Sequence, residues 1–341
     1  MLRDLQLRNF RCFESIAVEF SPGFNFIVGP NGRGKTTLLE AACVLLRLQS
    51  QRSASLAPAV RIGQRSFVVS GHAGEHLLQF YYSALRRKVA FDGVEQRDQA
   101  EYLRLVQVVS FASHDLELIR GPAEMRRRYL DFIGTQAEAR YRPVFRAYER
   151  ALRSRNALLK SPHRRPRELA AYTEPLVRAG TSLRQMRAAL VRRLAPFAEA
   201  SHRSISGGHE SLTLEYAPGS EEDFAAQLAH TRADEERLRL TMVGPHRDDL
   251  RLQVEAMPAA QFASEGQQRT TALALKLAQA QVFAEDAAAP PLLLVDDIFG
   301  ELDAARRNAL LAHLPNESQK LVTATALDWR AGEWEGPVLK L

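Results

Sequence analysis

The chain has 341 residues, 45% of them hydrophobic, which allows two globular domains or one domain with a large insertion. It has no apolar run of about 20 residues that could span a bilayer, and its amino terminus lacks a signal-peptide core, so we expect a cytoplasmic protein without a membrane partner. Its two cysteines, Cys12 and Cys43, lack C-x-x-C spacing, which argues against a disulfide framework and against a zinc site.

The first predicted elements are two strands joined by a turn. Leu5, Leu7 and Phe10 alternate with polar residues, and a second run at residues 16–20 ends at Ser-Pro-Gly. Residues 24–28 are largely apolar and predict a buried strand. This strand leads directly into the most informative stretch of the chain.

That stretch is a nucleotide-phosphate loop, which matches G-x-x-x-x-G-K-[ST] at every fixed position. It consists of Gly29, Pro30, Asn31, Gly32, Arg33, Gly34, Lys35 and Thr36, and Thr37 follows it. Glycines let backbone N–H groups turn towards phosphates, Lys35 can reach the β and γ phosphates in a binding and catalytic role, and Thr36 offers Mg²⁺ a hydroxyl. A helix start at residues 37–42 completes the required order of strand, loop and helix. We therefore predict ATP and Mg²⁺ as cofactors, and a chance match in an unrelated loop is the alternative.

Further strands are predicted beyond that helix. Residues 67–70, 77–82 and 88–91 are rich in β-branched and aromatic residues, and Asp92-Gly93 is a hairpin signal. They predict a small antiparallel sheet beside the phosphate loop. Residues 106–111 predict one more strand.

From Pro122 to about Ala200 the pattern becomes helical, with an interruption at residues 161–166. Residues 120–200 hold 19 Lys and Arg against 7 Asp and Glu, although the whole chain carries only +6. Such asymmetry is typical of a surface that binds a polyanion, with residues 126–128 and Arg164, Arg165 and Arg167 as the candidates. The alternative is codon bias on solvated helix faces, since the chain has 40 Arg against 6 Lys. Residues 212–216 then predict a strand and residues 221–240 a helix.

Two later motifs are of the kind that accompany a phosphate loop in P-loop ATPases. Residues 291–297 form an apolar strand that ends in Asp296 and Asp297, where P-loop NTPases hold Mg²⁺ and position the attacking water. We assign Asp296 to the metal and Asp297 to catalysis. About 30 residues earlier, Ser264, Gly266 and Gln267 precede a helix predicted at residues 270–283, and a helix amino terminus favours a phosphate. This spacing is that of the ABC-type signature motif, although the motif alone could be only an N-cap.

The chain resembles the RecF family of ABC/SMC-head-type ATPases over almost its full length. Four groups of residues carry the resemblance: residues 7–11 with 29–37 and 39–40; residues 111–131; residues 241–250; and residues 264–277 with Asp296, Asp297 and residues 301–303. Ser113, His114 and Gly300 depart from the family pattern. For Arg11, a nucleotide contact and a solvated surface position are both open.

The resemblance implies an α/β fold: a P-loop ABC-type, SMC-head-like ATPase lobe with an inserted, mainly helical lobe. We expect the ATPase lobe at residues 1–118 and 238–341 and the basic insertion at residues 119–237. It also implies an ATP-dependent repair factor that binds single-stranded or gapped DNA and, with RecO and RecR, helps to load RecA, supporting replication restart and the SOS response. Because the ABC signature faces the phosphates of a second subunit, an ATP-dependent homodimer is expected.

Three other functions are compatible with parts of the sequence. A transporter's nucleotide-binding subunit shares the three motifs, but it would not need so large a basic helical insertion, and residues 321–326 contain no switch His. A small-molecule kinase leaves residues 264–268 unexplained. A phage-defence ATPase with a nuclease domain would need more residues than remain.

Overall fold

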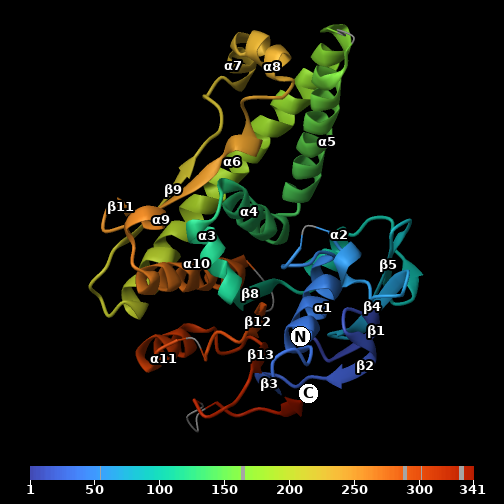
Figure 1. Cartoon of the computed structure of the whole chain (residues 1–341), viewed down its shortest axis with the longest axis vertical. Helices are drawn as coiled ribbons and strands as arrows, with labels where there is room; N and C mark the ends of the chain where they lie inside the picture. The colour runs from blue at the N-terminus through green and yellow to red at the C-terminus, as the bar shows by residue number, and fades with distance from the viewer. Residues whose placement is uncertain (54, 163–165, 287–289, 301, 330–333) are drawn as a thin grey trace. The chain divides into compact units, whose positions relative to one another are not determined.

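The computed structural model describes residues 1–53, 55–162, 166–286, 290–300, 302–329 and 334–341. The chain forms two compact units, and Figure 1 shows the elements of both. Unit 1 comprises Met1–Asp115 with Gln279–Leu341, and unit 2 comprises Leu116–Ala278. The lobes expected from the sequence divide instead at residues 119 and 238, and that division stays a prediction.

A five-stranded parallel sheet forms the centre of unit 1. Its order is β14-β3-β13-β12-β8, and every neighbouring pair is parallel. The strands are β3 (Phe24–Val28), β8 (Val108–Ala112), β12 (Leu292–Asp296), β13 (Lys320–Ala324) and β14 (Val338–Lys340). The inner strands are apolar runs rather than alternating ones, as a sheet buried on both faces requires. The strands predicted at residues 24–28, 106–111 and 291–297 are therefore present, although β8 begins two residues later than residue 106.

Unit 1 also contains a six-stranded antiparallel sheet in the order β2-β1-β4-β5-β6-β7. Its strands are β1 (Asp4–Phe10), β2 (Phe13–Glu19), β4 (Ser66–Ala73), β5 (His76–Ser83), β6 (Arg87–Phe91) and β7 (Val94–Glu95). Asp92 and Gly93 both have positive φ, 49° and 80°, as a two-residue type I′ hairpin turn needs. The predicted antiparallel sheet and its hairpin are thus confirmed.

Helix α1 (Lys35–Arg47) contacts strands of both sheets and is buried along almost its whole length. The other helices of unit 1 are α2 (Ala100–Arg104) and α11 (Ala304–His313), with a short 3-10 turn at Ala57–Ala59. Because α1 starts at the carboxyl end of β3, the loop between them lies where ligands bind in open parallel sheets.

Unit 2 is mainly helical. Its long helices are α4 (Ala123–Ala137), α5 (Tyr141–Lys160) and α6 (Pro166–Ile205). Helices α5 and α6 pack side by side (Figure 1), and Tyr141, Tyr148, Leu176, Leu183 and Phe224 lie in the core that they share with α7 (Phe224–His230). The predicted interruption at residues 161–166 falls between α5 and α6.

A three-stranded antiparallel sheet, in the order β11-β10-β9, completes unit 2. The remaining elements are α3 (Glu117–Arg120), β9 (Leu212–Ala217), α8 (Arg232–Leu238), β10 (Asp249–Val254), β11 (Met257–Pro258), α9 (Ala259–Phe262) and α10 (Glu265–Asp286), with 3-10 turns at Ser113–Leu116 and Pro245–Arg247; α10 continues into unit 1 at Gln279.

Two helix predictions differ from the structure. The single helix expected at residues 221–240 is two helices, α7 and α8, which meet at Thr231. The Thr231 hydroxyl donates to the Gln227 carbonyl at 3.0 Å, a contact that often bends helices. Helix α10 begins at Glu265 rather than residue 270, so Gly266 and Gln267 are helical. No described helix is long and apolar enough to cross a membrane.

Candidate nucleotide site and the polar core of the helical unit

The phosphate loop depends on two glycines with left-handed backbone geometry. Gly32 has φ 81° and Gly34 has φ 99°, a region that favours glycine. A Cβ atom at Gly34 would lie 2.5 Å from the Phe13 ring, so any side chain there would also clash. Gly34 is the N-cap of α1 and gives no side-chain cap. The amide N–H groups of the first helical turn therefore remain available to an anion.

Lys35 lies across this loop. Its Nζ donates to the carbonyl oxygens of Gly29 at 2.7 Å and Pro30 at 3.2 Å, and to Asn31 Oδ1 at 3.4 Å. Lys35 is only 6% exposed. A buried ammonium held mainly by carbonyl dipoles can exchange these weak acceptors for a phosphate, because a charged acceptor forms the stronger hydrogen bond.

The acidic strand end meets the phosphate loop at Thr36. The Thr36 hydroxyl donates to Asp296 Oδ1 at 2.8 Å, and the Thr323 hydroxyl donates to the same oxygen at 2.8 Å. Thr323 is the β13 residue paired with Asp296 of β12. A hydroxyl and a carboxylate side by side are oxygen ligands of the kind that Mg²⁺ takes. The residues predicted to bind metal thus lie together and fit the ion.

Asp297 follows in a left-handed conformation with φ 52°, which is uncommon for a residue other than glycine. Its N–H donates to Thr323 Oγ1 at 3.0 Å. Thr323 therefore contacts both acidic residues, and sequence analysis did not single it out. The available signal was a hydroxyl residue at the end of a buried strand that pairs with β12.

Arg11 is held by an ion pair. Its Nε and Nη2 donate to the two carboxylate oxygens of Glu40 at 2.9 and 2.7 Å, and Glu40 is fully buried on α1. Ser50 Oγ donates to Glu40 at 2.6 Å. Arg11 thus fastens the β1–β2 turn to α1, a role that neither sequence-based alternative anticipated.

The signature residues cap α10. Ser264 Oγ accepts from the Gln267 N–H at 3.2 Å, and Gln267 Oε1 accepts from the Ser264 N–H at 2.8 Å, which is a capping box. Gln267 Nε2 also donates to Glu210 at 3.0 Å. Ser264 is exposed and Gly266 is half-buried. The motif is an N-cap, and it leaves the start of a long helix open to an approaching ligand.

The predicted DNA-contact arginines differ in their exposure and in their partners. Arg126 is 13% exposed and donates to both Asp249 oxygens at 2.7 and 3.0 Å, so it is part of the interior contacts. Arg127 donates to the Asp248 carbonyl oxygen at 2.7 Å, and Arg128 is exposed and paired with Glu124. Arg164 and Arg165 lie outside the described residues, as do Glu301 and Arg330.

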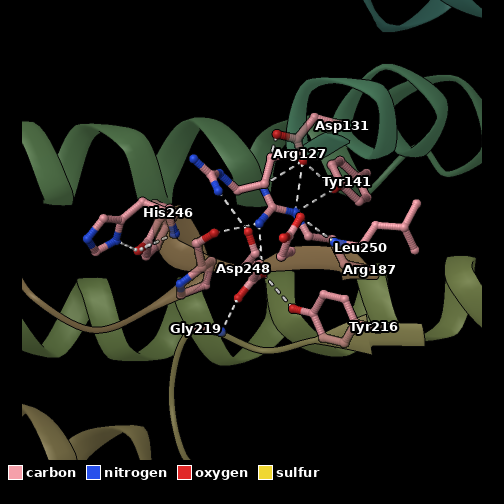
Figure 2. A network of polar contacts seen from close by, with 12 residues as sticks. Arg127, Asp131, Tyr141, Arg187, Tyr216, Gly219, His246, Asp248 and Leu250 are labelled. Atoms are coloured by element: carbon pink, nitrogen blue, oxygen red, sulfur yellow. Dashed lines mark hydrogen bonds and ion pairs between the residues drawn. The ribbon is translucent and has the colours of Figure 1, made fainter. Parts of the chain in front are cut away.

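Residues 244–250, to which the sequence assigned no role, lie in a buried polar network (Figure 2). Arg187 of α6 donates to the two oxygens of Asp131 on α4 at 2.8 and 2.9 Å, and to Asp248 Oδ2 and the Pro245 carbonyl at 2.7 Å each. The Tyr216 hydroxyl of β9 donates to Asp248 at 2.5 Å. The network therefore joins α4, α6 and β9 to the loop that precedes β10.

Burial sets the protonation of this network. Burial first, and then the Asp248 charge, raises the pKa of Tyr216, so its hydroxyl stays protonated and donates.

Gly244 has φ 127°, and a Cβ there would lie 2.7 Å from the Phe224 ring, which explains the glycine at the start of the loop. Ser113 and His114, which depart from the family pattern, are exposed.

Sequence comparison matches residues 1–328 to the RecF/RecN/SMC N terminal domain family. The DNA replication and repair protein RecF of Symbiobacterium thermophilum is 38% identical over 98% of this chain and 94% of its own length. RecF of Gloeobacter violaceus is 37% identical over 98% and 94% of the two chains.

Solved structures agree with this assignment. The recombination mediator protein RecF-ATP in the RecFOR pathway superposes with a TM-score of 0.90 at 26% identity, over 99% of this chain and 95% of that one. An Smc head bound to the C-winged helix domain of ScpA has a TM-score of 0.54 at 16% identity, over 95% and 90%, and shares the fold. The predicted α/β, SMC-head-like ATPase fold is thus confirmed. This chain belongs to the RecF family of ABC/SMC-type ATPases.

Proposed function

We propose that this chain is an ATP-dependent, DNA-binding factor of recombinational repair that hydrolyses ATP slowly. One observation carries the nucleotide part: Thr36 of the phosphate loop and Thr323 both donate to Asp296, 2.8 Å each, beside the buried Lys35. Phosphate binding and metal binding groups therefore converge at one edge of the parallel sheet. The solved structure of the recombination mediator protein RecF-ATP, and relatives named DNA replication and repair proteins, support the same function.

Each loop residue has a role in this proposal. Gly29 and Pro30 hold Lys35 through their carbonyl oxygens. Residues 31–34 present backbone N–H groups to the phosphates, Lys35 binds the β and γ phosphates, and Thr37 lies in the first turn of α1, whose N–H groups also face them. Thr36 and Asp296 would hold Mg²⁺, which neutralises phosphate charge when bound. The protein thus supplies positioning and charge, which are the main contributions in phosphoryl transfer.

Asp297 is the proposed catalytic base. It lies one residue beyond the metal ligand, and its left-handed backbone is the type of strained geometry that gathers at functional sites. Many ABC-type ATPases have Glu at this position. Since Asp is one methylene shorter, its carboxylate reaches less far towards water, and we expect slow turnover.

We propose further that ATP joins two copies of the chain. Ser264 and Gly266 lie at the exposed start of α10. The signature of one copy would bind the phosphates that the phosphate loop of the other copy holds. The interface should exceed about 1,000 Å² to be specific. DNA, single-stranded or gapped, is the proposed partner, with RecO and RecR as protein partners in RecA loading and the SOS response.

Sedimentation with and without ATP tests the dimer. Wild-type chain should double in mass with ATP, whereas Ser264→Arg should bind ATP as a monomer because the larger cation blocks the approach of the second loop. Ser264→Ala removes the cap, which costs about 1 kcal/mol, together with the hydroxyl, but it adds no bulk or charge, so it should still dimerise with ATP, more weakly than wild type and better than Ser264→Arg. A Ser264→Arg variant that still dimerises with ATP contradicts the proposal. A gel shift with gapped DNA, with and without ATP, tests the DNA part separately.

A further inference from the structure

Unit 2 has a surface hollow of about 560 Å³ at the start of α4. It is formed by the consecutive helices α4 and α5 and by the loop before β10, which comes much later in the sequence. Its lining comprises Pro122, Ala123, Glu124, Arg127, Asn156, Leu240, Thr241, His246 and Arg247. Nothing in the proposed ATP site uses these residues.

The hollow has two guanidinium groups without ion pairs. Arg127 donates to a neutral acceptor, the Asp248 carbonyl oxygen at 2.7 Å, and Arg247 is exposed. In the described parts of the chain, neither arginine forms an ion pair. Glu124, the carboxylate in the lining, is bound to Arg128 at 2.5 Å. The hollow therefore carries positive charge that no ion pair among the described residues neutralises.

His246 adds no positive charge at neutral pH. The Tyr148 hydroxyl lies 2.7 Å from Nδ1, and the Thr241 carbonyl oxygen lies 3.0 Å from Nε2, which fits a neutral ring with its proton on Nε2. Burial lowers the pKa of His246, and the charges of Arg247 and Arg127 lower it further. The positive charge thus belongs to the arginines. Figure 2 labels Arg127 and His246.

Two more groups offer donors to the hollow. Asn156 Oδ1 accepts from the N–H and the hydroxyl of Thr241, both at 2.8 Å, so the Asn156 Nδ2 group remains a donor. Helix α4 begins at Ala123 without a side-chain cap, so its first amide groups and the positive end of its dipole lie beside the same space. Guanidinium, amide and helix-start donors together select an oxyanion rather than a cation.

We propose that this hollow binds a phosphate group, held by Arg127, Arg247 and Asn156, and that the phosphate belongs to the backbone of single-stranded DNA. The inference rests on the proposed DNA binding and assigns it a place in unit 2. A backbone phosphate is favoured over free phosphate because the hollow is open and broad, and because residues 120–200, which include α4 and α5, carry a large positive excess.

Two variants test the site with little risk to the fold. Arg247→Gln removes the arginine that has no partner, and Asn156→Asp keeps both contacts to Thr241 while replacing a donor with a carboxylate oxygen. Arg251→Gln, on β10 and exposed, removes one charge from the same unit and is the matched control. We would measure affinity for a single-stranded oligonucleotide against salt concentration, and orthophosphate binding by calorimetry.

Arg247→Gln should lower DNA affinity about tenfold, since a hydrogen bond to a charged group is lost. It should also reduce the log–log salt slope by about 0.7, the value for one phosphate on a single strand. Asn156→Asp should weaken DNA binding at least as much, and Arg251→Gln should change neither quantity. Unchanged affinity and slope in both test variants would overturn the site while leaving DNA binding intact. Orthophosphate binding that only these variants lose, without an effect on DNA, would overturn the DNA source, and wild-type chain that binds no DNA would overturn the proposed function itself.

Discussion

At the residue scale, the phosphate loop owes its geometry to Lys35 and to Gly32 and Gly34, which precede it. Its ammonium is held by the carbonyl oxygens of Gly29 and Pro30. We expect Lys35→Ala to weaken ATP binding at least about 100-fold, because a charged hydrogen bond to phosphate is worth roughly 1.5–3 kcal/mol and the loop also loses its internal contacts. Fluorescent-nucleotide titration measures this, and Lys88→Ala, on a strand of the other sheet, is the control. Wild-type affinity in Lys35→Ala would reject the site.

A substitution at Asp297 should separate ATP binding from ATP hydrolysis. Asp297→Asn keeps the size of the side chain and the N–H contact to Thr323, so ATP binding and dimerisation should persist. Hydrolysis should fall about 10²- to 10⁴-fold, the usual contribution of a general base. Phosphate release under single-turnover conditions is the measurement. Turnover at the wild-type rate in the variant would place the base elsewhere.

Sequence alone predicted the nucleotide-site residues because each has a fixed chemical task at a fixed spacing. Gly32, Lys35 and Asp296 belong to patterns that chemistry constrains within a few positions. Thr323 and the Arg11–Glu40 pair could not be predicted in this way, since their partners lie on elements far away in the chain. Contacts of that kind depend on strand order and helix packing, which local patterns do not encode.

At the element scale, residues 244–250 show the same limit. The sequence around Asp248 contains a Gly-Pro step and charges of both signs, which is compatible with an exposed turn. The structure instead buries Asp248 and pairs it with Arg187 of α6. Periodicity predicted a helical region from Pro122 to about Ala200, but it could not reveal the break between α4 and α5 or the polar contact that these helices share with the loop. A buried arginine in a basic helix looks like a solvated one until its partner is located.

The network makes α6 sensitive to one substitution. Arg187→Met fills similar space but leaves Asp131 and Asp248 buried without their cation, which should cost about 3–5 kcal/mol of the free energy of unfolding. Denaturant unfolding followed by circular dichroism measures the loss. Arg153→Met, which breaks an exposed pair with Glu149 on α5, should cost less than about 0.5 kcal/mol. Equal effects of the two changes would show that Arg187 contributes only through packing.

At the scale of the whole molecule, the fold class followed from the resemblance to a known family, which rests on the three ATPase motifs and the other matched groups of residues. Unit 1 contains the phosphate loop and the acidic strand, and unit 2 contains the signature and most of the basic residues. The proposed nucleotide and DNA functions would therefore fall on the two compact units, apart from the signature at the start of α10. This makes the signature the expected link between ATP state and DNA affinity.

That link predicts how ATP changes DNA binding. If ATP joins two chains, each DNA strand meets two basic units, so the number of phosphates contacted should roughly double. The log–log salt slope for single-stranded DNA, about 0.7 per phosphate, should double with it. Asp297→Asn with ATP should show the steep slope continuously, because its dimer persists. Ser264→Arg with ATP should keep the shallow slope of the monomer although its basic residues are intact. If the salt slope of Ser264→Arg also becomes steeper with ATP, the nucleotide acts within one chain and the dimer is not the DNA-binding form.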